Sequence, residues 1–175
     1  IETLESFYRD RGYLKFSIES SQISLSRDKK LIFITFNVNE GEKYTINDVD
    51  VVGEIPFDED VYIDIVNRLK DTTYSQAQIT SIEEFFTNVL GNRGYAFAEV
   101  VGNPEINEAT NEVKLIFSVQ PGNRTYTRKI LFTGNDITQD YVLRREMRQF
   151  EGAWTSDNSI EAGKVRLERL GYFKE

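Results

Sequence analysis

The chain has 175 residues, of which 39% are apolar and 13% aromatic, a composition too rich in apolar side chains for a disordered protein. It contains no cysteine and no histidine, which excludes disulfides, zinc-thiolate sites, thiol nucleophiles and imidazole general bases. The net charge of −8 is concentrated in residues 43–122, where 5 basic and 14 acidic side chains give −9, so nucleic acid is disfavoured as a partner.

Two stretches of the sequence repeat one another in the same order. Residues 31–53 and 113–134 each begin with alternating apolar positions, pass through a connector containing glycine, and enter a second alternating stretch. Gly41 corresponds to Gly122, 81 residues further on (41 to 122). The apolar positions correspond as well, Ile32, Ile34, Phe36 and Val38 with Val113, Leu115, Phe117 and Val119. The chain is therefore built from repeats.

Glycine also closes three runs with helical spacing of apolar residues. The runs end at Gly12, Gly94 and Gly171, each followed by tyrosine, at intervals of 82 and 77 residues (12 to 94 and 94 to 171). Glycine suits the end of a helix because it adopts a left-handed conformation without a Cβ clash. A repeat of about 80 residues is long enough to hold its own small core. We therefore predict a first repeat at 1–43, a middle repeat at 44–122 and a last repeat at 123–175.

The first repeat predicts one helix followed by two strands. Apolar residues at helical spacing cover 4–11, and alternating apolar residues cover 16–25 and 31–38. The polar stretch 26–30 is turn-like, so an antiparallel hairpin is the simplest connection between the two strands.

The middle repeat predicts the complete pattern. A strand at 44–52 precedes two helices, and strands at 95–101 and 113–119 follow them. Ser75 and Gln78 form a capping box for the second helix. The inward stripes of the two helices consist of Val61, Tyr62, Ile65, Val66 and Leu69, and of Ile79, Ile82, Phe86 and Val89. The order βααββ predicts an α+β fold, a three-stranded mixed sheet with two helices packed on one face.

The last repeat predicts a strand at 126–133 and two helices at 138–150 and 156–170. Leu143, Met147 and Phe150 form the inward stripe of the first of these helices. We expect both ends of the chain to cut through a repeat, because the first repeat has no opening strand and helix and the last has no closing hairpin.

These features resemble POTRA modules. The βααββ order, the Arg-Gly-Tyr and Leu-Gly-Tyr helix ends, and above all the run from Gly134 to Trp154, GNDITQDYVLRREMRQFEGAW, are similar to the modules of BamA-type outer-membrane protein assembly factors. The resemblance implies the second half of a third module, a complete fourth and the first half of a fifth. It also implies that the full-length protein is anchored in the outer membrane by a carboxy-terminal barrel absent from this chain.

By the same resemblance, the chain is a periplasmic scaffold of a Gram-negative bacterium, without enzymatic activity or cofactor. It would bind unfolded outer-membrane proteins and dock accessory lipoproteins such as BamD. The alternative is the same fold acting as a spacer or docking module in another assembly or secretion barrel, TamA-like or of two-partner secretion, or in a cell-division protein.

The sheets predict a place for an extended client. A three-stranded sheet has two edges with unpaired backbone groups, to which another chain can add a strand. We assign this role to the second strand of each repeat, at Lys15 and Ser17 and at Phe97, Glu99 and Val101. The alternative is that charge and solvent only blunt these edges.

A basic face is predicted on the helix at 138–150. Because the apolar stripe turns inward, Arg144, Arg145 and Arg148 lie on the opposite side together with Glu146. A solvated helix surface explains these charges as well as a docking surface does. The resemblance favours docking, since the corresponding module of the family contacts the lipoprotein.

Other charged or aromatic groups predict no catalytic, metal or nucleic-acid site. Asp58, Glu59 and Asp60 begin a helix, where the helix dipole favours acids without any metal. Asp48 and Asp50 share a strand face, but no histidine or second carboxylate pair is predicted to face them.

The aromatic residues of the first hairpin are predicted to be core. Alternation places Phe36 with Ile32 and Ile34 on the face that a helix covers and leaves Phe33 opposite. At most one aromatic ring is then displayed, too few for a base-stacking sheet.

Neighbouring copies are a further expected partner. The incomplete repeats at the two ends have complementary deficits, so the amino-terminal hairpin of one molecule could pair with the last repeat of another. Fraying of both ends is the alternative.

Overall fold

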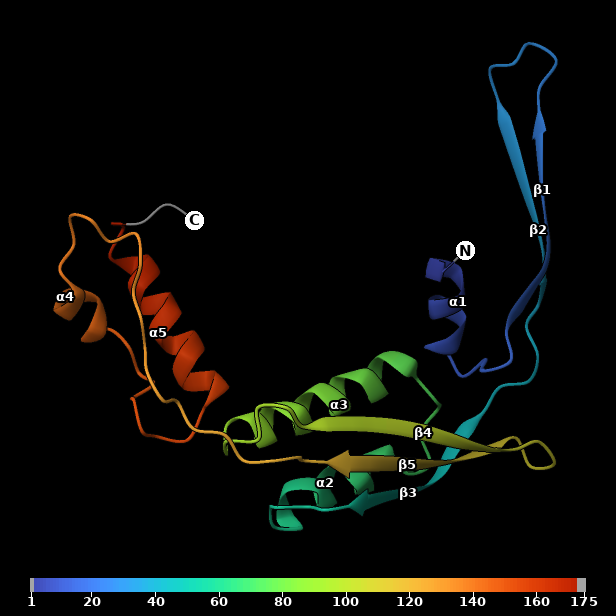
Figure 1. Cartoon of the computed structure of the whole chain (residues 1–175). Coiled ribbons are helices and arrows are strands. Elements are labelled where there is room, and N and C mark those ends of the chain that lie inside the picture. Colours follow the sequence, from blue (N-terminus) through green and yellow to red (C-terminus); the bar gives the residue numbers. More distant parts are fainter. Residues whose placement is uncertain (1, 173–175) are drawn as a thin grey trace. The chain divides into compact units, whose positions relative to one another are not determined.

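The structure is a computed structural model that describes residues 2–172. Its elements are α1 (Glu2–Arg9), β1 (Ser17–Leu25), β2 (Ile32–Asn39), β3 (Thr45–Gly53), α2 (Asp60–Leu69), α3 (Gln76–Gly91), β4 (Glu99–Asn107), β5 (Glu112–Gln120), α4 (Asp140–Arg144) and α5 (Asp157–Arg169) (Figure 1). The chain divides into two compact units, one comprising 1–52, 57–82 and 102–117 and the other 53–56, 83–101 and 118–175. No helix in the described part of the chain is long and apolar enough to cross a membrane.

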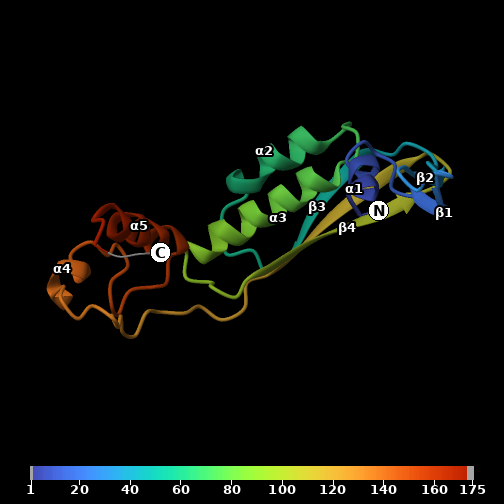
Figure 2. The same cartoon turned by 90° about the horizontal axis from the view of Figure 1, so that it is seen from above.

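The middle repeat has the predicted two-layer architecture. Its three strands pair in the order β3-β5-β4. The arrows of β3 and β5 point the same way in Figure 1 and that of β4 points the opposite way, so the sheet is mixed. Figure 2 shows α2 and α3 along one side of these strands. The predicted fold class, α+β with two helices on one face of a three-stranded sheet, is confirmed.

The buried side chains of the middle repeat follow the predicted periodicities. On β5, the central strand, Val113, Leu115, Phe117 and Val119 are buried and alternate with partly exposed residues. Val66 and Leu69 are the buried residues of α2, and Ile79, Phe86 and Leu90 are buried on α3. The predicted stripes are therefore confirmed in part. Leu90, which was not predicted, is buried, and the remaining predicted residues are only partly buried, namely Val61, Tyr62, Ile65, Ile82 and Val89.

Serine and glycine mark the boundaries of the long helix α3. The backbone N–H of Gln78 donates to Ser75 Oγ at 3.4 Å, so the predicted capping residue is confirmed. The helix ends at Gly91, and the chain then reverses at Gly94, whose φ is +97°. There the N–H of Tyr95 donates to the carbonyl of Leu90 at 3.1 Å, the bond that closes a Schellman motif.

The hairpin of the first repeat forms as predicted, but its apolar face is not covered. β1 and β2 pair antiparallel as a two-stranded sheet. Phe36, Ile32 and Ile34 are exposed, as is Phe33, so the prediction that a helix covers the first three is wrong in the described chain. The physical reason is length: the eight residues of α1 span about 12 Å at 1.5 Å each, less than half of a nine-residue strand.

Only the base of the hairpin is packed against α1. The rings of Tyr8 on α1 and Phe16, just before β1, stack with their centroids 4.1 Å apart, and Phe16 is buried. Beyond this contact the strands extend without a helix beside them (Figure 1).

The last repeat differs from prediction in two places. Residues 126–133 do not form a strand, because among the described residues their only strand-type pairing is an isolated bridge between Tyr126 and Trp154. The first helix is only the five-residue α4, so the prediction of a helix over 138–150 is wrong beyond Arg144.

A buried glutamine fixes the segment that follows that helix. The amide of Gln149 donates to the carbonyl of Trp154 at 3.0 Å and accepts the N–H of Ser156 at 3.0 Å, which holds the connector to α5 in a non-helical path. Gln149 is consequently buried, while Phe150, predicted to face inward, is 68% exposed. Leu143 is buried as predicted and Met147 is half-buried. The second helix, α5, is confirmed, with Ser156 as its N-cap.

Candidate functional site

The predicted client strand β4 lies at an edge of the middle sheet, as expected from the strand order. Glu99 and Val101 point away from the buried face and are exposed. Phe97 is more exposed still, but it belongs to the turn that precedes β4. Pro104 interrupts the donors of this edge, because proline has no N–H to offer a new strand. The part of the edge open to an added strand is therefore the stretch before Pro104.

In the first repeat, both strands of the hairpin are edges. Ser17 is the first residue of β1, and Lys15 precedes the strand. The ammonium group of Lys15 forms an ion pair with Glu108 in the turn between β4 and β5. That pair, with the hydrogen bond it contains, raises the pKa of Lys15 and lowers that of Glu108. Lys15 thus has an internal partner and does not stand free beside the strand.

The predicted basic face of the last repeat separates into two kinds of residue. Arg145 and Arg148 are exposed, and within the described residues Arg148 makes no ion pair. Arg144 and Glu146, in contrast, are engaged in contacts inside the repeat. The exposed pair, Arg145 and Arg148, is called the arginine surface below.

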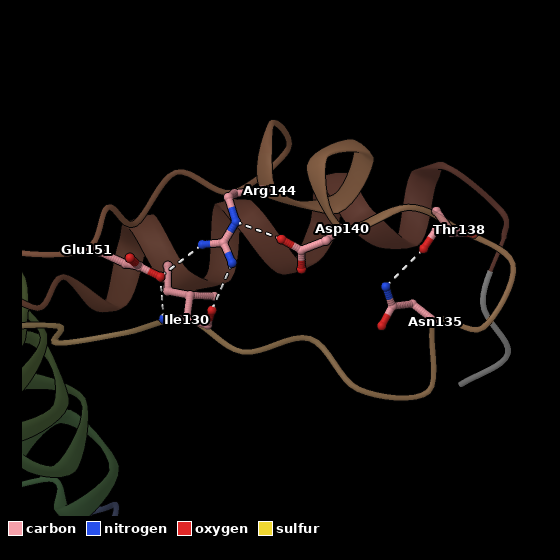
Figure 3. A network of polar contacts seen from close by, with 6 residues as sticks. All are labelled: Ile130, Asn135, Thr138, Asp140, Arg144 and Glu151. Atoms are coloured by element: carbon pink, nitrogen blue, oxygen red, sulfur yellow. Dashed lines mark hydrogen bonds and ion pairs between the residues drawn. The ribbon is translucent and has the colours of Figure 1, made fainter.

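Arg144 ties α4 to the segment that runs beside it (Figure 3). Its guanidinium donates to Asp140 at 3.0 Å, to Glu151 at 2.9 Å and to the carbonyl of Ile130 at 3.1 Å. The bonds to Asp140 and then to Glu151 raise the pKa of Arg144. The N–H of Ile130 donates to Glu151 at 2.8 Å and, with Arg144, lowers the pKa of that carboxyl. This network stabilises the fold of the repeat and leaves Arg144 few donors for a partner.

Glu146 occupies a position that the sequence could not reveal. Its side chain is only 16% exposed and lies against α5, where Arg166 donates to it from two nitrogens at 2.8 and 3.1 Å. The bonds from Arg166 hold the pKa of Glu146 below its usual value. Arg145 donates to the other carboxylate oxygen at 3.2 Å. Arg166 was missed because nothing in its sequence neighbourhood indicates that α5 faces Glu146.

An apolar groove with a volume of about 660 Å³ opens in the same repeat. It lies between the segment around Phe132 and the helices α4 and α5. Its apolar lining comes from Ile130, Leu131, Phe132, Leu143, Met147, Ile160 and Leu167. The predicted inward residues Leu143 and Met147 are therefore part of this lining.

Several acidic residues of the middle repeat form ion pairs or lie at the start of a helix. Asp48 pairs with Lys70 at 3.0 Å, and Lys114 contacts Asp50 at 2.6 Å. The bond from Lys70 lowers the pKa of Asp48, and the bond to Asp50 raises that of Lys114. Residues 58–60 precede or begin α2, and among the described residues no group of three acids is placed to hold a metal ion.

Comparison with known proteins agrees with this architecture. The profile of the family described as POTRA, surface antigen variable number repeat, matches residues 1–41, 44–122 and 125–175. The outer membrane protein assembly factor BamA of Buchnera aphidicola is 33% identical over 100% of this chain, and that of Neisseria meningitidis is 32% identical over 99%. The chain covers 28% and 22% of these two relatives, less than a third of their length.

Two solved structures are similar as well. The crystal structure of POTRA3-5 of Haemophilus influenzae BamA superposes with a TM-score of 0.84 at 30% identity, over 99% of this chain and 68% of that one. BamA of Haemophilus ducreyi lacking POTRA domains 1-3 superposes with a TM-score of 0.65 at 37% identity, over 75% of this chain and 25% of that one. The chain therefore belongs to the POTRA family, and its repeats are POTRA modules of the BamA type.

Proposed function

We propose that the chain belongs to the periplasmic region of an outer-membrane β-barrel assembly factor in a Gram-negative bacterium. The observation that carries the proposal is the likeness to POTRA3-5 of a BamA over 99% of the chain. In this function the modules bind unfolded outer-membrane proteins, dock accessory lipoproteins of the same complex, and perform no chemical step. The full-length protein would be held in the outer membrane by a barrel that follows the modules.

Client binding is proposed at the exposed part of β4. An edge strand offers backbone donors and acceptors to any extended chain, which suits clients that share β-strand geometry rather than sequence. Exposed Val101 and the apolar Phe97 ahead of it add side-chain contacts to those hydrogen bonds. Pro104 limits the register that an added strand can take.

A photo-crosslinking experiment tests the client site. A crosslinking residue replaces Val101, which is 49% exposed on β4, or, as the matched control, Val52, which is 44% exposed on the opposite edge strand β3. An unfolded outer-membrane protein should crosslink at 101 and much less at 52. Equal crosslinking at both positions would count against a β4 site.

Lipoprotein docking is proposed at the arginine surface, with a lipoprotein such as BamD as the partner. Arg145 and Arg148 present exposed guanidinium groups, which suit carboxylates of a partner. Arg144 and Glu146 act behind this surface, since their contacts hold α4 and the turn after it in place.

A pull-down with the purified lipoprotein tests this docking. Arg145→Glu with Arg148→Glu should abolish binding, whereas Arg128→Glu, an exposed arginine elsewhere in the last module, should not. Retained binding by the double variant would contradict the arginine surface. A spacer function in another assembly or secretion barrel is the second candidate, and it predicts that the unaltered chain captures neither lipoprotein nor client.

A further inference from the structure

One set of hydrogen bonds recurs where each module passes to the next. We call each such passage a joint. At the first joint, between the first and the middle module, the N–H of Tyr44 donates to the carbonyl of Gly12 at 2.9 Å. At the second joint, the N–H of Thr125 donates to the carbonyl of Gly94 at 2.7 Å. Gly12 and Gly94 have φ values of +98° and +97°, so the two helix ends present their carbonyls in the same way. Each joint lies within one compact unit.

A second bond at each joint crosses from a helix end to a helix start. Asp10 Oδ1 accepts the backbone N–H of Ala77 at 2.8 Å, and Asn92 Oδ1 accepts the backbone N–H of Asn158 at 2.8 Å. Ala77 and Asn158 are the second residues of α3 and α5. The first turn of a helix has N–H groups without intrahelical partners, and here the preceding module supplies one of the missing acceptors.

The helix starts already have a cap of their own. Ser75 Oγ accepts the N–H of Gln78 at 3.4 Å, and Ser156 Oγ accepts that of Ser159 at 3.3 Å. The bond from the preceding module is therefore additional to an ordinary N-cap. The helix does not need the second acceptor, Asp10 or Asn92, in order to begin. We therefore expect that acceptor to influence how the two modules are joined.

We propose that Asp10 and Asn92 are positioning residues that cap the second helix of the following module and thereby set the angle of each joint. A capping bond is short and directional, so it fixes where the helix start lies relative to the helix end. The carbonyl bonds of Gly12 and Gly94 hold the same two segments at a second point. Two points of attachment restrict rotation, whereas a single one permits it.

The second joint has further contacts that are not described at the first. The guanidinium of Arg124 lies 4.3 Å from the ring centroid of Trp154, and its Nε donates to the carbonyl of Arg93 at 2.7 Å. Lys43 and Thr73 occupy the corresponding positions at the first joint, where this cation–π contact cannot form. Asn92 also accepts the hydroxyl of Ser156 at 3.2 Å. The second joint is accordingly the stiffer of the two.

Among residues 2–172, the arrangement is found at these two helix ends. Arg169 stands two residues before Gly171, where the other two helix ends carry Asp10 and Asn92. A guanidinium has no acceptor atom, so Arg169 cannot cap a helix start.

The test compares Asn92→Ala, just after the end of α3, with Asn88→Ala, a matched change of an exposed asparagine in the last turn of α3. The first readout is amide hydrogen exchange at Asn158, which should accelerate roughly five- to thirtyfold in Asn92→Ala and stay unchanged in Asn88→Ala. The second is the distance distribution between spin labels at 84 on α3 and 161 on α5, which should broaden only in Asn92→Ala. Asn92→Asp keeps an acceptor and should restore both readouts.

The same design applies to the first joint, with Asp10→Ala, the rescue Asp10→Asn and the control Asp64→Ala on the surface of α2. Here Ala77 reports the exchange, and labels at 5 and 80 report the distance. In the unaltered protein, the distribution across the second joint should be the narrower of the two. The proposal is overturned if the alanine variants match their controls in both readouts, or if Asn92→Asp behaves like Asn92→Ala.

Discussion

Arg166 donates from Nη2 and Nε to a single carboxylate oxygen of Glu146, at 2.8 and 3.1 Å, and so joins α5 to the turn after α4. This pair makes Glu146 part of the fold of the last module, in addition to any contact with a partner. Glu146→Lys would place a third cation beside Arg166 and Arg145, and we expect it to lower the melting temperature. Reversing a surface carboxylate with weak partners, Glu161→Lys, should change it little.

A charge swap separates the two roles of Glu146. The double variant Glu146→Arg with Arg166→Glu restores opposite charges and should recover much of the melting temperature that Glu146→Lys loses. Thermal melting followed by circular dichroism measures this recovery. If Glu146→Lys melts at the same temperature as the unaltered chain, the ion pair between Glu146 and Arg166 does not stabilise the fold, and Glu146 acts only through contact with a partner.

The ion pairs of the last module predict how stability depends on pH. The pKa values of Glu146 and Glu151 are lowered in the folded chain, chiefly by Arg166 and by the N–H of Ile130 respectively. A carboxyl with a lowered folded pKa stabilises the fold above its unfolded pKa, about 4.3, and loses that contribution as the pH falls through the folded value. The melting temperature should therefore fall as the pH drops below about 4.

Glu146→Gln is the control for this dependence, because glutamine does not titrate. The melting temperatures of the unaltered chain and of this variant should differ most near neutral pH and converge in acid. A difference that stays constant down to pH 3 would contradict an ionised Glu146 as its source.

Two adjacent phenylalanines of α3 test the core of the middle module. Phe86 is fully buried, whereas Phe85 beside it is 43% exposed. Phe86→Ala should lower the free energy of unfolding by about 3–5 kcal/mol, because it removes a buried ring and leaves a cavity. Phe85→Ala should cost less than about 1 kcal/mol. Chemical denaturation measures both, and similar losses would mean that the helix faces the sheet in another register.

Backbone protection should differ between the sheets. β5 is the central strand of the middle sheet, with pairing on both sides, while β1 and β2 each pair on one side only. Hydrogen exchange should therefore be slowest in β5 and faster along the hairpin. Equal protection would indicate that the hairpin is covered in solution.

The spacing of apolar residues correctly predicted the parts of the chain whose burial depends only on contacts within one module. The alternation of Val113 to Val119 and the capping role of Ser75 are local patterns, and both are present in the structure. The second helix of the last module, with Ser156 at its start, was predictable for the same reason.

Features decided by a distant partner were not predictable. The apolar spacing of Leu143, Met147 and Phe150 continues a helix, but the helix ends at Arg144. The side chain of Gln149 instead binds backbone groups further along, in the connector to α5. The pairing of Glu146 with Arg166 depends on how α5 packs, which no spacing in the sequence encodes. The sequence thus predicted which residues form the candidate basic face. It did not predict that Arg145 and Arg148 are exposed while Arg144 and Glu146 are paired inside the module.

The hairpin of the first module provides the last prediction, self-association of the chain. Ile32, Ile34, Phe36 and Val38 on β2 hold the same repeat positions as the buried residues of β5, yet they are exposed. The last module has an apolar groove of about 660 Å³ beside residues 126–133, which have no strand paired with them in the described chain apart from a bridge. A hairpin from a second copy could supply both missing elements, because it would bring a strand to pair with residues 126–133 and an apolar face to cover the groove.

Light scattering across a concentration series measures this association, and two neighbouring residues of β2 supply the variant and its control. Ile34 is 57% exposed on the face that corresponds to the core, and Phe33 is 54% exposed on the opposite face. We expect the mass of the unaltered chain to rise with concentration, Ile34→Asn to prevent the rise and Phe33→Asn to leave it, because only the first change places an amide in the apolar contact. A chain that stays monomeric throughout, or two variants that behave alike, would show that the exposed face does not drive pairing between copies.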